Sequence, residues 1–254
     1  MKIRAIAINT FREAARNKVF YLLIVVGLVF VLSSRVVSLL VIGDRVQVLK
    51  DIGLAAINFF SVLIAIFTGI NLVFKEIDKK TVYNILSKPI SRHCFILGKF
   101  LGLAFTLLVA LGSMMLVFSM FLLLAAGEFD WRLLIYFLLL YSELLIITAV
   151  SLVFSSFSTP ILSSIFTIIV YLIGHVVWTF NEFKHRLVDP VVKIVAYVMY
   201  YILPNLEKYN IKDQLVMGES VRWNLVGYSL LYAALYISAL LLLSVIIFNR
   251  REFQ

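Results

Sequence analysis

The sequence predicts an all-α polytopic membrane protein, and three observations predict it: the composition, the length of the apolar runs and their continuity. Of the 254 residues, 63% are hydrophobic and 15% are charged, with a mean hydropathy of +1.03. A soluble domain is roughly half apolar and about a quarter charged. The excess of apolar side chains must therefore face lipid.

Six apolar runs are each long enough to cross a bilayer as a helix, which needs about 20 residues. They cover residues 19–42, 52–74, 100–126, 133–157, 161–180 and 225–248. The runs are continuous, whereas the strands of a membrane barrel would alternate over short segments. Helices also satisfy their own backbone hydrogen bonds in lipid. We therefore expect six transmembrane helices in one domain over residues 1–254.

Two other segments are expected to lie along the membrane surface. Residues 1–18 place Ile3, Ile6 and Phe11 at helical spacing among charged residues, which is typical of an amphipathic surface helix. The run Val191–Leu203, between two prolines, reaches only about 20 Å as a helix. We expect it to lie at the interface within an outer loop over residues 181–224.

The distribution of charge predicts the orientation of the chain. If the N-terminus is cytoplasmic, the inner segments hold 13 Lys and Arg against four Asp and Glu, and the outer segments hold 10 against nine. Cytoplasmic loops are enriched in Lys and Arg near span ends. The net charge of +9 is thus an orientation signal that places both termini in the cytoplasm, and it does not indicate a nucleic-acid-binding patch.

No pattern in the sequence indicates catalysis or a metal site. Cys94 is the single cysteine, and no cluster of Cys, His and Asp has metal-ligand spacing. The chain also has no Gly-x-x-x-x-Gly-Lys-Ser/Thr motif, since Gly98 and Lys99 are followed by Phe100. We therefore expect neither a catalytic residue nor a P-loop nucleotide site in this chain.

The inner segment between the second and third spans, residues 75–99, carries the most specific pattern. Ile77, Thr81 and Ile85 share one helical face in a charged segment, which indicates a short amphipathic helix. Pro89 ends that helix, and Ser91 is placed to cap the next one. Such a helix serves as a surface linker, as a solvated turn or as a docking element for a soluble partner.

This layout resembles the permease subunit of type-2 ABC transporters, of the exporter type. The resemblance is carried by Glu76, Thr81, Ile85 and Leu86, then by Pro-Ile-Ser-Arg at 89–92 and by Leu-Gly-Lys at 97–99. One departure is Lys80, where many relatives have Gly, and it puts the local helix geometry in doubt. The segment Leu203–Glu207 also resembles the last outer loop of some members.

The resemblance implies that residues 75–99 include a coupling helix and that residues 1–18 form an elbow helix. It implies an ATPase-coupling interface at Glu76, Lys79, Lys80, Thr81, Tyr83, Asn84, Pro89, Ser91 and Arg92. The implied partners are two copies of a cytoplasmic ATP-binding subunit and a second permease, identical or not. ATP and Mg would be held by the ATP-binding subunit. The implied location is the bacterial inner membrane.

Glu143 and His175, within two of the predicted spans, are the candidate path or intramembrane polar residues. Glu143 is midway along the fourth span, where a charge costs about 2.5–3.5 kcal/mol on insertion scales, so it is expected to face the bundle interior. It is either a residue of the transport path or a neutral acid bonded to a neighbour. His175, in the fifth span, is more often an interhelical hydrogen-bonding residue than a ligand.

Small residues recur at every fourth position from Gly98 through Gly102 to Thr106 and Ala110. Such a stripe predicts close helix packing and is a candidate dimer face.

Two other functions remain open from the sequence. An ion-coupled secondary carrier would favour more intramembrane charge and an inverted repeat. A membrane scaffold or assembly subunit that transports nothing needs the same spans and docking helix.

Overall fold

Within the residues that the structure describes, the protein is an all-helical bundle with six helices long and apolar enough to cross a membrane, as the sequence predicts. The computed structural model describes residues 2–41, 43–78, 91–127, 129–183 and 190–250. The six helices are α2 (Lys18–Leu40), α3 (Arg45–Asp78), α5 (Arg92–Ala126), α6 (Arg132–Ser155), α7 (Pro160–Phe183) and α10 (Trp223–Arg250).

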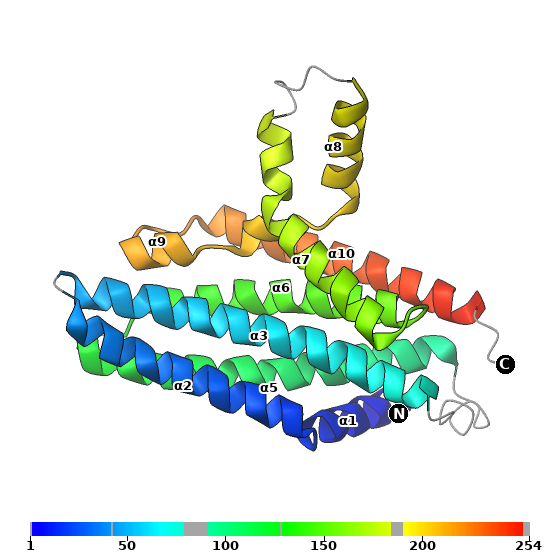
Figure 1. The fold of residues 1–254 in the computed structure, drawn as a ribbon, viewed down its shortest axis with the longest axis horizontal. Helices are drawn as coiled ribbons and strands as arrows, with labels where there is room; N and C mark the ends of the chain where they lie inside the picture. The colour runs from blue at the N-terminus through cyan, green and yellow to red at the C-terminus, as the bar shows by residue number, and fades with distance from the viewer. Residues whose placement is uncertain (1, 42, 79–90, 128, 184–189, 251–254) are drawn as a thin grey trace.

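The helices run mostly along the long axis of the molecule (Figure 1). We call the end that holds Leu40, Arg45 and Trp223 the outer end, and the opposite end, near both chain termini, the inner end.

Helix α6 is the centre of the bundle. It packs against α3, α5, α7 and α10, and its sequence is apolar all round, as expected of a helix buried on every side. Of its most apolar window, 72% is buried, against 11% for α10 and 22% for α2. Helices α2 and α10 therefore lie at the outside of the bundle with most of their apolar residues exposed.

Two of the spans, α3 and α5, exceed the hydropathy runs by about two turns or more, and α7 and α10 exceed them by about one turn. α3 has 34 residues and α5 has 35, so each is about 50 Å long. The extra turns of α3 begin where Asp44 Oδ1 accepts hydrogen bonds from Val46 N and Gln47 N. Hydropathy marks the apolar part of a helix, whereas capping and charged first turns set where it starts.

Two ion pairs connect segments of the chain at the outer end. Lys50 Nζ lies 2.7 Å from Asp130 Oδ2, and Lys212 Nζ lies 2.8 Å from Asp51 Oδ1. The second pair connects α3 to the short helix α9 (Lys212–Met217), which follows the 3-10 turn η1 (Leu206–Tyr209).

Helix α8 (Pro190–Ile202) stands crosswise to the long helices, beside the end of α7 (Figure 1). It has 13 residues and is too short to span. Its placement at the membrane surface stays a prediction.

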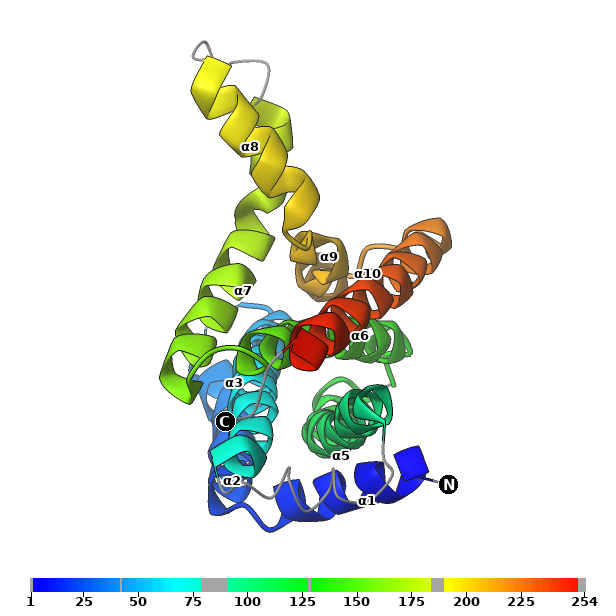
Figure 2. The same ribbon diagram turned by 90° about the vertical axis from the view of Figure 1, so that its right-hand side faces the viewer.

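The N-terminal helix α1 (Lys2–Ala15) lies across the inner part of α5 (Figure 2). The two helices approach closely because α5 carries glycines there. A Cβ built on Gly98 would lie 2.7 Å from Ile6 Cβ, and one on Gly102 would lie 2.6 Å from Ala7 O. Both glycines therefore face α1 rather than an open surface for a second copy.

We expect Gly102→Ala to destabilise the protein by about 1–3 kcal/mol, because the added methyl overpacks the α1–α5 contact. The matched control is Gly112→Ala on the same helix, where nothing lies within 4 Å of the added Cβ. That variant should be neutral or slightly stabilising, by up to about 1 kcal/mol, because alanine favours helix. Unfolding in mixed detergent micelles measures both, and equal effects would contradict the close packing.

Candidate functional site

At the inner end, polar side chains of α5 connect this helix to α1 and to α10. Lys99 of α5 has a side chain only 1% exposed, and its Nζ lies 3.7 Å from Glu13 Oε2 on α1. An ammonium removed from water needs an opposite charge nearby. Glu13 provides that charge, so the ion pair fastens α1 to the start of α5.

Arg92 fastens α10 to the same place. Its Nη1 donates hydrogen bonds of 2.9 Å to the carbonyl oxygens of Phe248 and Asn249, near the C-terminal end of α10. A cation is favourable there because the last carbonyls of a helix carry partial negative charge. The rings of Phe95 and Phe248 stack at 5.6 Å and add apolar contact between α5 and α10.

Of the nine residues predicted for an ATPase-coupling interface, only Ser91 and Arg92 have described side chains. Ser91 takes the extended N-cap conformation at the start of α5 but makes no side-chain cap bond. Its hydroxyl instead lies 2.9 Å from His93 Nε2 and 3.0 Å from Cys94 Sγ. Glu76 lies near the end of α3. The remaining six lie outside the described residues: Lys79, Lys80, Thr81, Tyr83, Asn84 and Pro89.

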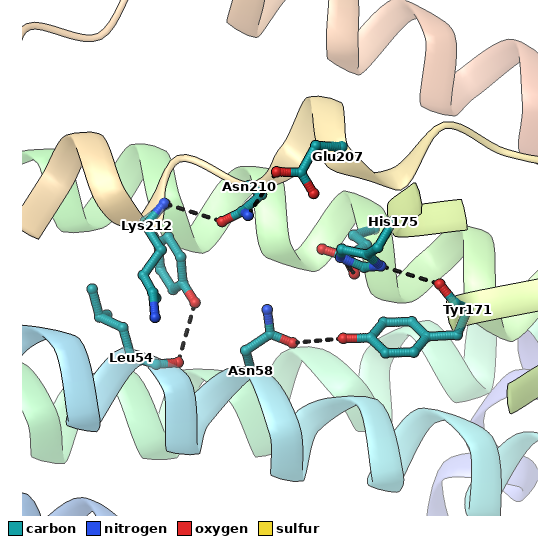
Figure 3. Close-up of polar contacts among 9 residues, drawn as sticks. Leu54, Asn58, Tyr171, His175, Glu207, Asn210 and Lys212 are labelled. Carbon is teal, nitrogen blue, oxygen red and sulfur yellow. Dashed lines mark hydrogen bonds and ion pairs between the residues drawn. The ribbon is translucent and has the colours of Figure 1, made fainter. Parts of the chain in front are cut away.

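The two predicted intramembrane polar residues lie together. Glu143 on α6 has a side chain 2% exposed, and its Oε1 lies 3.5 Å from His175 Nε2 on α7. His175 Nδ1 lies 3.1 Å from the backbone oxygen of Tyr171 (Figure 3).

The second contact of His175 fixes the orientation of its ring. A carbonyl oxygen only accepts hydrogen bonds, so Nδ1 of His175 donates to Tyr171 and Nε2 faces the carboxyl group of Glu143. Within the described part of the chain, Glu143 Oε1 makes no hydrogen bond, so the 3.5 Å contact with His175 is its nearest polar interaction on α7.

Three residues that the sequence analysis missed extend this polar cluster to α3. The Tyr171 hydroxyl donates to Asn58 Oδ1 at 3.3 Å (Figure 3), and the Tyr136 hydroxyl donates to the Leu54 carbonyl at 3.2 Å. Asn58 had a detectable signal, since an amide within an apolar run needs a partner in lipid. Nothing in the sequence singled out Tyr136 and Tyr171, because tyrosine also occurs singly in lipid-facing belts.

The segment that follows α8, residues 204–209, contacts α7 and α10 at the outer end. A Cβ on Gly174 would lie 2.8 Å from Leu206 Cδ1, so α7 and this segment touch. The Tyr209 hydroxyl donates to the Ser229 carbonyl at 3.0 Å, and Asn205 N donates to the Tyr232 hydroxyl at 3.1 Å. Burial raises the pKa of Tyr209, so its phenol stays protonated and keeps donating.

The contacts at both places hold helices together. At the inner end Lys99 and Arg92 connect the start of α5 to α1 and α10, and the polar cluster around Glu143 connects α3, α6 and α7. Among the described residues, no group of three or more His, Cys, Asp and Glu could hold a metal ion.

These features define a multi-pass membrane protein whose N-terminal helix α1 packs on the inner end of the bundle. The family model described as ABC-2 family transporter protein matches residues 4–253, and the chain belongs to this family. A comparison with curated proteins finds no match. The family match confirms the resemblance to the permease of type-2 ABC transporters.

A double-mutant cycle tests the contact between Glu143 and His175. His175→Ala should cost about 1 kcal/mol more beside Glu143 than beside Glu143→Gln, because interhelical polar contacts in membranes are worth about that much. The control is Ser238→Ala, whose hydroxyl bonds only its own helix at Ala234 O. Unfolding free energies in mixed micelles give the coupling, and a value near zero would refute the pairing.

Proposed function

We propose that this chain is the permease subunit of an ATP-driven transporter and that a separate cytoplasmic subunit binds and hydrolyses ATP. The chain would move a substrate across the bacterial inner membrane, with both termini in the cytoplasm. Support comes from the family match over residues 4–253 and from the excess of Lys and Arg in the segments assigned to the inner side.

The proposal rests on the contacts that connect α5 to α1 and α10 at the inner end. The start of α5 lies within the predicted coupling loop, residues 75–99, and is connected to α1 by Lys99 and to α10 by Arg92. A displacement at Ser91 would therefore move α1, α5 and α10 together. This is the mechanical requirement for a permease driven by a soluble motor.

The proposed assembly contains two permeases and two ATP-binding subunits. The exposed apolar faces of α2, α7 and α10 supply surface both for lipid and for a second permease copy. The α1-facing glycines do not contribute, because α1 of the same chain covers them.

Within this proposal, Glu143 and His175 fix α6 to α7 and do not line the transport path. Glu143 is 1% exposed in the single chain, so a passing substrate would have to separate the helices to reach it. Glu143→Gln should therefore preserve transport, since Gln keeps the shape and a polar group. A large loss of transport with normal protein levels would instead place Glu143 in the path.

Charge reversal at the predicted coupling segment tests the ATP-driven mechanism. Glu76→Lys should lower the ATPase rate of the complex, copurified and reconstituted in nanodiscs, by about tenfold, which corresponds to roughly 1.4 kcal/mol of interface energy. Deleting residues 76–87 should abolish stimulation without preventing insertion.

The matched control for this test is Glu219→Lys, an exposed charge reversal at the outer end. It should leave the ATPase rate unchanged. A chain that copurifies with no ATP-binding subunit, or a deletion that leaves stimulation intact, would overturn the proposal.

A reporter fused after Gln254 tests the topology. We expect an enzyme that is active only in the cytoplasm to be active there, because six spans return the chain to its starting side. Activity of a periplasm-specific reporter at this position would mean that the segment Val191–Leu203 crosses the membrane.

A further inference from the structure

The side of α1 that faces away from α5 carries exposed arginines. Thr10 and Ala14 are 0% exposed, and the side chains of Ile6 and Thr10 lie against the glycines of α5. On the other side, Arg12 and Arg16 are exposed. These two residues lie one turn apart, because Arg16 N donates a hydrogen bond to Arg12 O at 3.1 Å. Their guanidinium groups are therefore presented together, away from the bundle.

The positive charge of this side is not neutralised within α1. Four of its residues are exposed cations: Lys2, Arg4, Arg12 and Arg16. Glu13 is the single acid between residues 2 and 18, and its carboxylate pairs with the buried Lys99 at 3.7 Å. Within the described part of the chain, none of the three arginines forms an ion pair. An anionic partner would relieve the repulsion among these cations.

An apolar side chain is exposed beside the same cations. Ile8 is 41% exposed and lies one turn from Arg4 on one side and one turn from Arg12 on the other. The partner must therefore accept an apolar side chain as well as cations. The border of a bilayer offers both, because phosphates lie directly above acyl chains. An acidic protein surface would complement the arginines but would need a separate apolar pocket for Ile8.

The position of α1 relative to the spans favours the same partner. Helix α1 crosses α5 from the side (Figure 2), and the rings of Phe11 and Phe105 lie 4.7 Å apart. Phe105 is 13 residues from the start of α5 at Arg92, which corresponds to about 20 Å along the helix. Only Arg16 and Asn17 separate α1 from α2. Helix α1 thus lies beside the spans, where lipid surrounds them, and not beyond their tips.

We propose that α1 binds the head groups of anionic phospholipids through Arg12 and Arg16, with Ile8 inserted among the first carbons of the acyl chains. A guanidinium group matches the geometry of a phosphate with two parallel hydrogen bonds. A zwitterionic lipid carries its own ammonium group, so it gains less from the arginines. The bound lipid would fix α1 at the bilayer border, and the Glu13–Lys99 pair would transmit this constraint to the start of α5.

The proposal can be tested on the full chain purified in an uncharged maltoside detergent, without an ATP-binding subunit. Native mass spectrometry gives the dissociation constants of added phosphatidylglycerol and phosphatidylethanolamine. Phosphatidylglycerol should bind about tenfold or more tightly, because each cation near an anionic lipid surface contributes about fivefold. Inorganic phosphate should not compete with it, because a free phosphate brings no acyl chain for Ile8.

Two double variants isolate the charge of the arginines. Arg12→Gln with Arg16→Gln should weaken phosphatidylglycerol binding by about tenfold or more, whereas Arg12→Lys with Arg16→Lys should keep most of it. The matched control is Arg45→Gln with Arg222→Gln, which removes two exposed arginines at the outer end. The control should leave the preference for phosphatidylglycerol unchanged.

The ATP-binding subunit is the alternative partner of this basic side. If the glutamine variant loses copurification of that subunit while it still prefers phosphatidylglycerol, the surface is a protein-docking face and the proposal is overturned. Equal binding of the two lipids, competition by inorganic phosphate, or an equal loss in the control variant also overturns it. The lipid measurements involve neither ATP nor transport, so their failure would leave the proposed function standing.

Discussion

The constraint on which the structure depends is that a bilayer offers no hydrogen-bond partners, so each polar group in a span must be paired within the protein. Glu143 is the most demanding case, because α6 carries it into the centre of the bundle. The partner is His175 on α7, and the cluster reaches α3 through Tyr171 and Asn58. Apolar helices alone pack with little preference for one neighbour, since lipid is as apolar as leucine. The polar cluster therefore selects which helices surround α6.

A second set of polar contacts gives the inner end a different property. There the buried Lys99 pairs with Glu13 on α1, and Arg92 donates to the last carbonyls of α10. Breaking the pair of Lys99 would leave an uncompensated buried charge, which is costly. The inner end is thus suited to keeping α1, α5 and α10 together, whereas the cluster around Glu143 is suited to preserving the order of α3, α6 and α7.

Sequence reasoning predicted the class of fold and the six spans, because hydropathy over about 20 residues reports directly on the cost of placing a helix in lipid. It placed the start of α3 about seven residues late, since Asp44 caps a charged turn that hydropathy cannot detect. Glu143 was predicted to face the bundle interior and His175 to bond another helix, yet nothing in the sequence indicated that the two lie together. The glycines at 98 and 102 predicted close packing, but the partner helix, α1, depended on how the chain folds back at Asn17. The sequence pattern did not predict which elements distant along the chain contact each other.

Helix α10 connects the two ends of the protein. At its inner end Arg92 holds the carbonyls of Phe248 and Asn249, and near its outer start Ser229 and Tyr232 accept hydrogen bonds from the segment 205–209. A helix is stiff along its axis because every turn is hydrogen-bonded to the next. A shift of α5 at the inner end would thus reach the segment 205–209 at the outer end through α10. In the proposed transporter, this connection would let a soluble motor at one face act on the structure of the opposite face.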